Sequence, residues 1–170
     1  MMMGSVSERT DEVAAERVVV LLRHSYGELR RFAAVAAPSE MAPDDLVHDA
    51  IVSVLRSNGF DGVELPVAYL KRTMLNLASN ERRRLGRRRR AVLRLEREAR
   101  DVDDAYPSDL AHLDELSPNE RTVLYLHYVE GDPFETIAQD LGMRTSSVRQ
   151  TATRARRSLR RLNGADDDQD

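Results

Sequence analysis

The sequence has no cysteine and no tryptophan, and Lys71 is the only lysine among its 26 basic residues. Without cysteine the chain can form neither disulfides nor thiolate metal sites. No apolar run approaches the roughly 20 residues that a membrane-spanning helix needs. Residues 1–12 also lack the hydrophobic core of a signal peptide. We therefore expect a cytoplasmic protein without membrane insertion.

The residue types that enzymes use for chemistry are scattered along the chain. His24, His48, His112 and His127 do not have the spacing of metal ligands, and no glycine-rich loop of the phosphate-binding kind occurs. We expect no enzymatic activity, no metal site and no cofactor.

What the chain does contain is arginine, concentrated in two blocks. Residues 82–100 hold ten arginines and two glutamates, and residues 144–161 hold seven arginines and no acid. The net charge is nevertheless −3, so the remainder of the chain is strongly acidic. Arginine-rich composition can simply follow from a GC-rich genome. Two basic blocks within an acidic chain, however, favour contact with nucleic acid.

Apolar residues recur at helical spacing through most of the first hundred residues. Residues 12–36 and 43–56 predict two helices, and Pro43 suits the first turn of the second. A third helix opens at Pro66 and runs into the first arginine block, with Gly86 expected as a weak point or a break. Since no strand pattern occurs, we predict an all-α protein.

Helix-start signals divide the C-terminal part of the chain. Ser117-Pro118-Asn119-Glu120 is a capping box with proline at the first helical position. Asp132-Pro133-Phe134-Glu135 repeats that device, and Thr145 can cap a last helix that reaches about Leu162. We predict two small helical domains, residues 12–100 and 116–163, joined by an acidic linker at 101–115 and followed by a disordered acidic tail at 164–170.

The spacing of three residues predicts a helix-turn-helix in the second domain. Ala138 is small enough for a close helix crossing, Gly142 can take the positive φ of the turn, and Val148 anchors the second helix. Residues near the start of such a recognition helix reach base edges in the major groove. Arg149 can form two hydrogen bonds with the edge of a guanine, and Gln150 can do the same with an adenine. The predicted DNA-contacting residues are Arg144, Thr145, Ser146, Ser147, Arg149, Gln150, Thr153, Arg154 and Arg157.

Both halves of the chain resemble bacterial RNA polymerase sigma factors. The stretch "LSPNERTVLYLHYVEGDPFETIAQDLGMRTSSVRQTATRARRSL" looks like region 4, which reads the promoter −35 element. The stretches "PDDLVHDAIVSVLRS" and "LPVAYLKRTMLNLASNERRRLGRRRR" look like region 2, which binds the polymerase clamp and opens the −10 element. Two such domains without an intervening one are similar to the extracytoplasmic-function (ECF) group.

The resemblance implies partners and further site residues. It implies binding to RNA polymerase core and to promoter DNA, and an anti-sigma factor that covers these surfaces until a signal arrives. Residues at the positions of the polymerase-binding helix are Asp44, Asp45, His48 and Asp49. Residues at the positions that handle the −10 element are Lys71, Arg72, Asn76, Ser79, Asn80, Arg82 and Arg83.

Four positions depart from the pattern of that family. Tyr69 stands where a tryptophan is usual, and Ala42 replaces an acidic helix cap. Thr151 and Ala152 are small where a larger apolar residue often braces the recognition helix. Few aromatic side chains are therefore present to stack on unpaired bases.

Two alternative functions fit parts of the sequence. A free-standing helix-turn-helix regulator explains the second domain but leaves the acidic helix and the first arginine block without a role. An arginine-rich RNA-binding protein explains residues 82–100 alone and does not need the helix-turn-helix.

Overall fold

The computed structural model describes residues 5–57, 59–96 and 115–162, and all secondary structure in these ranges is helical. Three N-terminal helices, α1 (Ser5–Ala36), α2 (Pro43–Arg56) and α3 (Pro66–Glu96), are followed by three C-terminal helices. The latter are α5 (Pro118–Tyr128), α6 (Phe134–Leu141) and α7 (Thr145–Leu162). The all-α prediction is therefore confirmed. The predicted linker at 101–115 lies almost wholly outside the described residues, as does the tail at 164–170.

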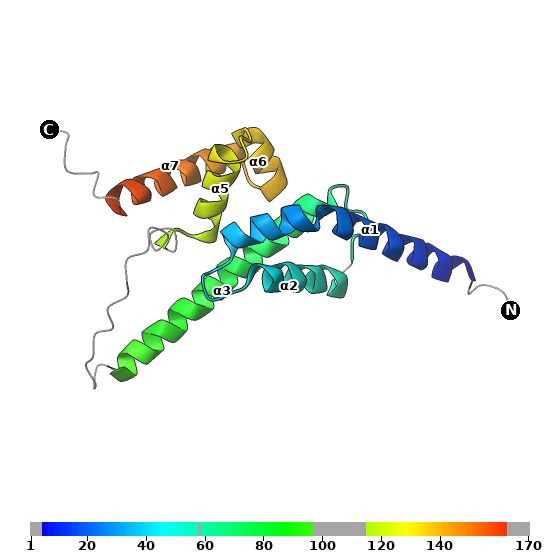
Figure 1. Ribbon diagram of the computed structural model, residues 1–170, viewed down its shortest axis with the longest axis horizontal. Helices are drawn as coiled ribbons and strands as arrows, with labels where there is room; N and C mark the ends of the chain where they lie inside the picture. The colour runs from blue at the N-terminus through cyan, green and yellow to red at the C-terminus, as the bar shows by residue number, and fades with distance from the viewer. Residues whose placement is uncertain (1–4, 58, 97–114, 163–170) are drawn as a thin grey trace.

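The N-terminal helices form a three-helix unit (Figure 1). Leu29 and Phe32 of α1, Leu46 of α2, and Leu70 and Met74 of α3 are buried between them. Helix α2 begins at Pro43 after Ala42, whose extended backbone places it at the cap without any side-chain hydrogen bond. Instead, the negative charges of Asp44 and Asp45 in the first turn interact favourably with the positive end of the helix dipole.

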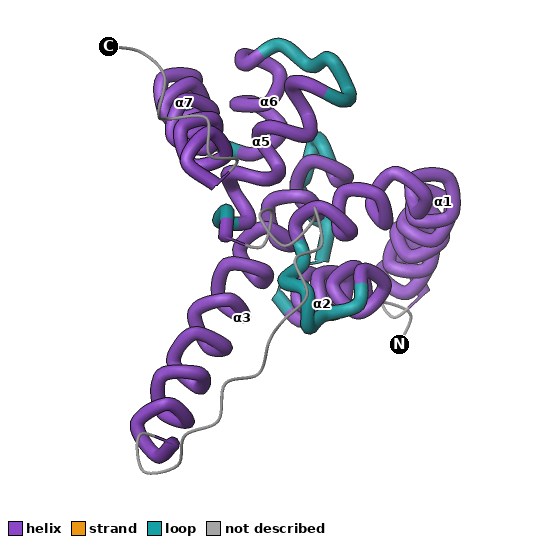
Figure 2. The backbone as a smooth tube through the Cα atoms, turned by 60° about the vertical axis from the view of Figure 1, so that its left-hand side comes forward, coloured by secondary structure: helices purple, strands orange, loops and turns teal. Residues whose placement is uncertain are grey.

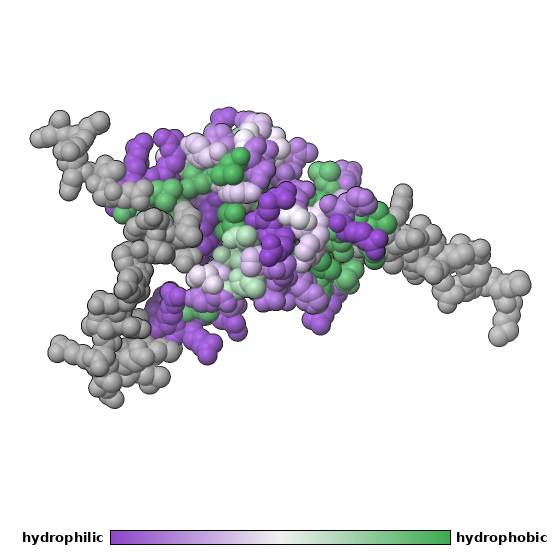
Figure 3. Space-filling view, viewed as in Figure 1, coloured by the Kyte–Doolittle hydropathy of each residue, from purple (hydrophilic) through white to green (hydrophobic). Residues whose placement is uncertain are grey.

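Two predictions about the long helices were wrong. Helix α1 starts at Ser5 rather than at residue 12. Helix α3 continues through Gly86 to Glu96 without a break, because a single glycine costs an exposed helix only about 1 kcal/mol and leaves its backbone hydrogen bonds intact. Its far end projects away from the other helices (Figure 2). The described part of that end is strongly hydrophilic (Figure 3), and it carries exposed arginines at 87–90.

Local signals position the C-terminal helices. The Ser117 hydroxyl accepts from the Glu120 backbone N–H while the Glu120 carboxylate accepts from the Ser117 N–H, so the capping box is confirmed. The second predicted capping box was wrong. The N-cap of α6 is Pro133, which makes no side-chain capping hydrogen bond. The negative charge of Glu135 in the first turn still interacts favourably with the helix dipole.

Candidate nucleic-acid interface

Helices α6 and α7 form a tight helix-turn-helix. Gly142 adopts φ +63° and ψ 34° at the end of α6, a left-handed conformation that glycine adopts without steric cost. The Met143 N–H donates to the Ala138 carbonyl at 2.9 Å and closes the turn. Ile137 and Val148 are completely buried beside Ala138. The predicted spacing of alanine, glycine and valine therefore produces the expected motif.

One side of α7 is buried and the other side is exposed. The buried side chains are Val148, Thr151, Ala152 and Ala155, whereas Leu159 and Leu162 farther along the same edge are only half-buried. Thr151 is 3% exposed, so its small side chain fills the position where a larger brace was expected. The exposed predicted DNA-contacting residues are Arg144, Ser146, Arg149, Gln150, Thr153, Arg154 and Arg157, and Thr145 and Ser147 are partly exposed.

Arg149 is held by an acid from the neighbouring helix. Its Nη2 donates to Glu135 Oε1 at 2.7 Å, and both side chains are 62% exposed. Glu135 lies in the first turn of α6, so the ion pair links the two helices of the motif at its outer surface. No sequence pattern indicates this pair, because residues 14 positions apart become neighbours only after the turn has formed. A DNA base that binds the Arg149 guanidinium must therefore either displace Glu135 or share the guanidinium with it.

The predicted polymerase-binding residues Asp44, Asp45, His48 and Asp49 all lie exposed on α2. They occupy the side of the helix opposite its buried residues Leu46, Val47, Ala50 and Val54. We refer to the four as the acidic face. The structure therefore brings this predicted set together on one surface.

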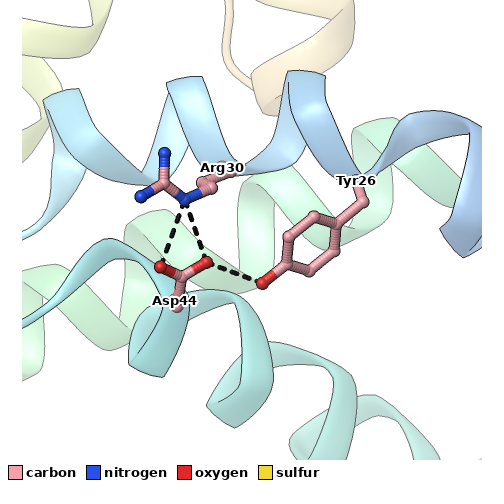
Figure 4. Close-up of polar contacts among 3 residues, drawn as sticks. All are labelled: Tyr26, Arg30 and Asp44. Carbon is pink, nitrogen blue, oxygen red and sulfur yellow. Dashed lines mark hydrogen bonds and ion pairs between the residues drawn. The ribbon is translucent and has the colours of Figure 1, made fainter.

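Asp44 differs from the rest of the acidic face because α1 binds it (Figure 4). The Tyr26 hydroxyl donates to Asp44 Oδ1 at 2.7 Å, and Arg30 Nε donates to Oδ1 and Oδ2 at 3.0 and 3.1 Å. The hydrogen bonds from Tyr26 and then Arg30 lower the pKa of Asp44, and the same contact raises the pKa of Tyr26. Asp44 thus connects α2 to α1, a role that its position in the sequence did not reveal.

The predicted −10 residues divide into two groups along α3. Asn76, Asn80 and Arg83 are exposed, and Ser79 and Arg82 are partly exposed. Arg82 Nη2 donates to the Glu115 carbonyl at 2.7 Å, at the start of the described C-terminal segment. These five side chains form an accessible polar and basic strip.

Lys71 and Arg72 are not on that accessible strip. The Lys71 side chain is only 9% exposed, and its Nζ lies 2.7 Å from Glu28 and 3.8 Å from Asp140. Arg72 Nε donates to the Asp140 carbonyl at 3.0 Å, and Nη2 donates to the Gln139 carbonyl. Both cations therefore contact helix α6, Lys71 as a buried side chain and Arg72 as a partly exposed one.

The described residues contain neither a membrane-spanning helix nor a metal-binding cluster. No helix among them combines the length and apolar character of a membrane span. No group of three or more histidine or acidic side chains within the described ranges is arranged to hold a metal ion.

Comparison with known proteins agrees with this geometry. Residues 110–159 match the family model of sigma-70 region 4. The fold resembles a solved structure, the sigma factor RpoE from Bartonella quintana in complex with the anti-sigma factor NepR. The TM-score is 0.60 and the identity 20%, over 89% of this chain and 99% of that chain. No curated protein matches the sequence.

The region-4 match covers α5, α6 and most of α7, and the solved structure extends the likeness of fold to the N-terminal helices. The resemblance of the C-terminal stretch to region 4 is thereby confirmed. Residues 110–159 are similar to sigma-70 region 4, and the chain shares the fold of that solved sigma factor.

Proposed function

We propose that this protein is a transcription initiation factor that binds RNA polymerase core and directs it to specific promoters through their −35 and −10 elements. The observation that carries the proposal is the exposed face of α7, which is free of acids and belongs to a helix-turn-helix within a sigma-70 region 4. The polymerase performs the chemistry, and this protein supplies promoter recognition and assists strand opening.

Recognition of the −35 element is assigned to the start of α7. Arg149 and Gln150 are exposed there and have the side chains that pair bidentately with guanine and adenine. The exposed arginines farther along, Arg154, Arg157 and Arg160, suit phosphate contacts, which supply affinity without sequence information.

Polymerase binding is assigned to Asp45, His48 and Asp49 of the acidic face, with Asp44 fixing the helix that presents them. Two observations support this division. Asp45, His48 and Asp49 are exposed, and Asp44 is engaged by Tyr26 and Arg30. The assignment of all four positions to polymerase binding follows from the resemblance of this stretch to region 2.

Contact with the −10 element is assigned to the strip of Asn76, Ser79, Asn80, Arg82 and Arg83, joined by Lys71 and Arg72. A positive groove suits single-stranded DNA, which binds largely through charge and base stacking. Tyr69 packs against the hydrophobic core as a partly buried side chain, so little stacking surface accompanies this strip. We therefore expect charge to contribute more than stacking.

An anti-sigma factor is a further proposed partner. Support comes from the solved structure of similar fold, which is a complex of a sigma factor with the anti-sigma factor NepR. A partner of this class would bind the free protein and compete with RNA polymerase core.

The test is a binding experiment with purified bacterial RNA polymerase core. Wild-type protein should bind tightly, and Asp45→Arg should abolish binding because it reverses a charge on the acidic face. Asp61→Arg is the matched control, since Asp61 is also an exposed acid, in the loop after α2, and its replacement should be tolerated.

The same experiment tests the alternative function. A free-standing helix-turn-helix regulator would not bind core but would bind duplex DNA alone with strong salt dependence. That combination of results, or equal binding to core by Asp45→Arg and wild type, would contradict the assignment of the acidic face.

A further inference from the structure

The first arginine block has no role in the proposed function beyond Arg82 and Arg83. The rest of its described part is the far end of α3, which runs past the −10 strip to Glu96 and stands clear of the other helices (Figures 1 and 2). Like charges three or four positions apart destabilise a helix. A polyanionic partner would offset that repulsion, so this end of α3 is a candidate binding surface.

Nearby acids neutralise some arginines of this helix end but not others. Arg84 is paired with Glu81 at 2.7 Å, and Arg89 is paired with Glu40 of the segment between α1 and α2. Three exposed arginines have no ion-pair partner among the described residues, and we call them the arginine ridge: Arg87, Arg88 and Arg90.

The arginine ridge continues the −10 strip along the same side of α3. Asn76, Asn80, Arg83, Arg87 and Arg90 follow one another at intervals of three or four positions, and all five are exposed. Residues at this spacing are neighbours on one face of a helix. A nucleic acid bound along the strip would therefore meet the ridge next.

The composition of α3 favours a duplex over a single strand as the partner of the ridge. Proteins that bind single strands stack the bases on aromatic side chains, and α3 has no aromatic residue after Tyr69. Arg87 and Arg88 are successive residues, so their side chains leave the helix about 100° apart and can meet phosphates on two sides of it.

The shape of the projecting helix favours DNA over RNA. An α-helix with its side chains is about 10–12 Å across, which matches the roughly 12 Å width of the major groove of B-form DNA. The major groove of duplex RNA is deep and narrow, so protein side chains do not reach into it. Arginines on a free helix end therefore fit the two phosphate backbones of a DNA groove best.

The ridge is also close enough to the −10 strip for both to contact one DNA molecule. A helix rises about 1.5 Å per residue, so Arg87 and Arg90 lie roughly 10 and 15 Å beyond Asn80. At about 3.4 Å per base pair of B-form DNA, this distance corresponds to roughly three to four base pairs.

We propose that the arginine ridge binds the phosphate backbone of duplex DNA next to the −10 element, without reading its sequence. Binding to duplex DNA follows from the charge, exposure and shape of the free end of α3. Its place beside the −10 element rests on the proposed function. Contacts of this kind add affinity for every sequence and increase the salt dependence of binding.

The first test is the binding of the full-length protein to a labelled DNA duplex of random sequence, followed by fluorescence anisotropy at several salt concentrations. Arg87→Gln with Arg90→Gln removes two charges of the ridge, and glutamine keeps a high helix propensity. Arg23→Gln with Arg56→Gln is the matched control, since these two arginines are also exposed but lie on α1 and α2.

The ridge variant should bind the duplex about tenfold or more weakly at about 0.1 M salt, and its salt slope should fall by about two. The control should bind like wild type. Equal affinity and equal slope in the two double variants would overturn the proposal, provided that circular dichroism shows the same helix content in both.

A second test locates the contact on the chain. Because the protein has no cysteine, Ala91→Cys at the exposed end of α3 can carry a photo-crosslinker, and Ser53→Cys on α2 is the exposed control. A labelled duplex should crosslink at position 91 and not at position 53. Unlabelled duplex DNA should compete at least about tenfold better than single-stranded DNA or duplex RNA of the same length. Absence of the crosslink, or better competition by RNA or by single strands, would refute the assignment to duplex DNA.

Both measurements use the protein without polymerase, so their result is independent of the core-binding experiment. Loss of duplex binding in the ridge variant, together with no binding of wild type to core, would support the ridge and contradict the proposed function. Binding to core, together with equal duplex binding by the ridge variant and the control, would contradict the ridge alone.

Discussion

Arg72 lies against Gly142 across the interface between the N-terminal and C-terminal helices. A Cβ atom added to Gly142 would stand 2.9 Å from Arg72 Nε and 3.1 Å from its Cδ and Cζ. The glycine that permits the turn of the helix-turn-helix thus also permits the close approach of the arginine that docks it. One residue therefore serves both the local motif and the tertiary contact.

Gly142→Ala should destabilise the protein for both reasons. Alanine at φ +63° costs about 1–2 kcal/mol, and the new methyl group displaces Arg72 from the carbonyls it binds. For a chain of this size we expect Tm to fall by roughly 2–8 °C. Thermal unfolding of Gly142→Ala in wild-type and Arg72→Ala backgrounds separates the two effects. An equal cost in both backgrounds would mean that Arg72 does not restrict this position.

Asp44→Asn should lower stability near neutral pH and have less effect in acid. The folded-state pKa of Asp44 lies below its ordinary value of 3.8, so the unfolded state binds the proton more tightly. The contribution is complete above pH 3.8 and disappears as the pH falls through the folded-state pKa. Tm measured against pH for wild type and Asp44→Asn should therefore converge on acidification. A difference in Tm that is independent of pH would contradict the charged contacts with Tyr26 and Arg30.

Arg149→Ala and Arg160→Ala should weaken DNA binding in different ways. Loss of a bidentate guanine contact removes about 1–3 kcal/mol of discrimination at one base position. Loss of a phosphate contact instead weakens binding to all sequences alike and reduces the salt slope by about one. Titration of a panel of −35 variants at several salt concentrations distinguishes these results. Uniform loss for both variants would refute the division of α7 into reading and anchoring parts.

Glu135→Gln should affect DNA binding through Arg149 and leave stability nearly unchanged. An exposed ion pair contributes about 0–1 kcal/mol, so Tm should barely change. Glu135 competes with a base for the Arg149 guanidinium, so its neutralisation should tighten binding to the preferred −35 sequence. The gain should be absent in an Arg149→Ala background. A gain of the same size without Arg149 would indicate only a general loss of repulsion from DNA.

Features built from neighbouring residues could be predicted from the sequence. The capping box at Ser117 and Glu120 and the turn at Gly142 depend on side chains within a few positions of each other, so their spacing carries the information. The exposed face of α7 follows from helical periodicity in the same way. The prediction of a break at Gly86 was wrong. The low helix propensity of one glycine, about 1 kcal/mol, does not overcome the favourable helix on both sides of it.

Contacts between distant residues could not be predicted in this way. Tyr26 and Arg30 meet Asp44 only because α1 and α2 pack together, and Glu135 meets Arg149 only after the turn has closed. Nothing in the sequence around Lys71 and Arg72 indicates that they face another part of the same chain. As isolated cations beside an arginine block, they have the same pattern as residues that bind DNA.

The sequence by itself therefore determined the class of fold, the helix-turn-helix, the exposed arginine-rich face of α7 and the resemblance of the C-terminal stretch to sigma-70 region 4. These depend on local hydrogen bonding, turn geometry and periodic burial, each of which operates over a few residues. Only the tertiary structure decided which charged side chains are accessible and which are paired. Asp44, Lys71 and Arg72 have partners 14 to 69 positions away, and such partners are selected by the packing of whole helices.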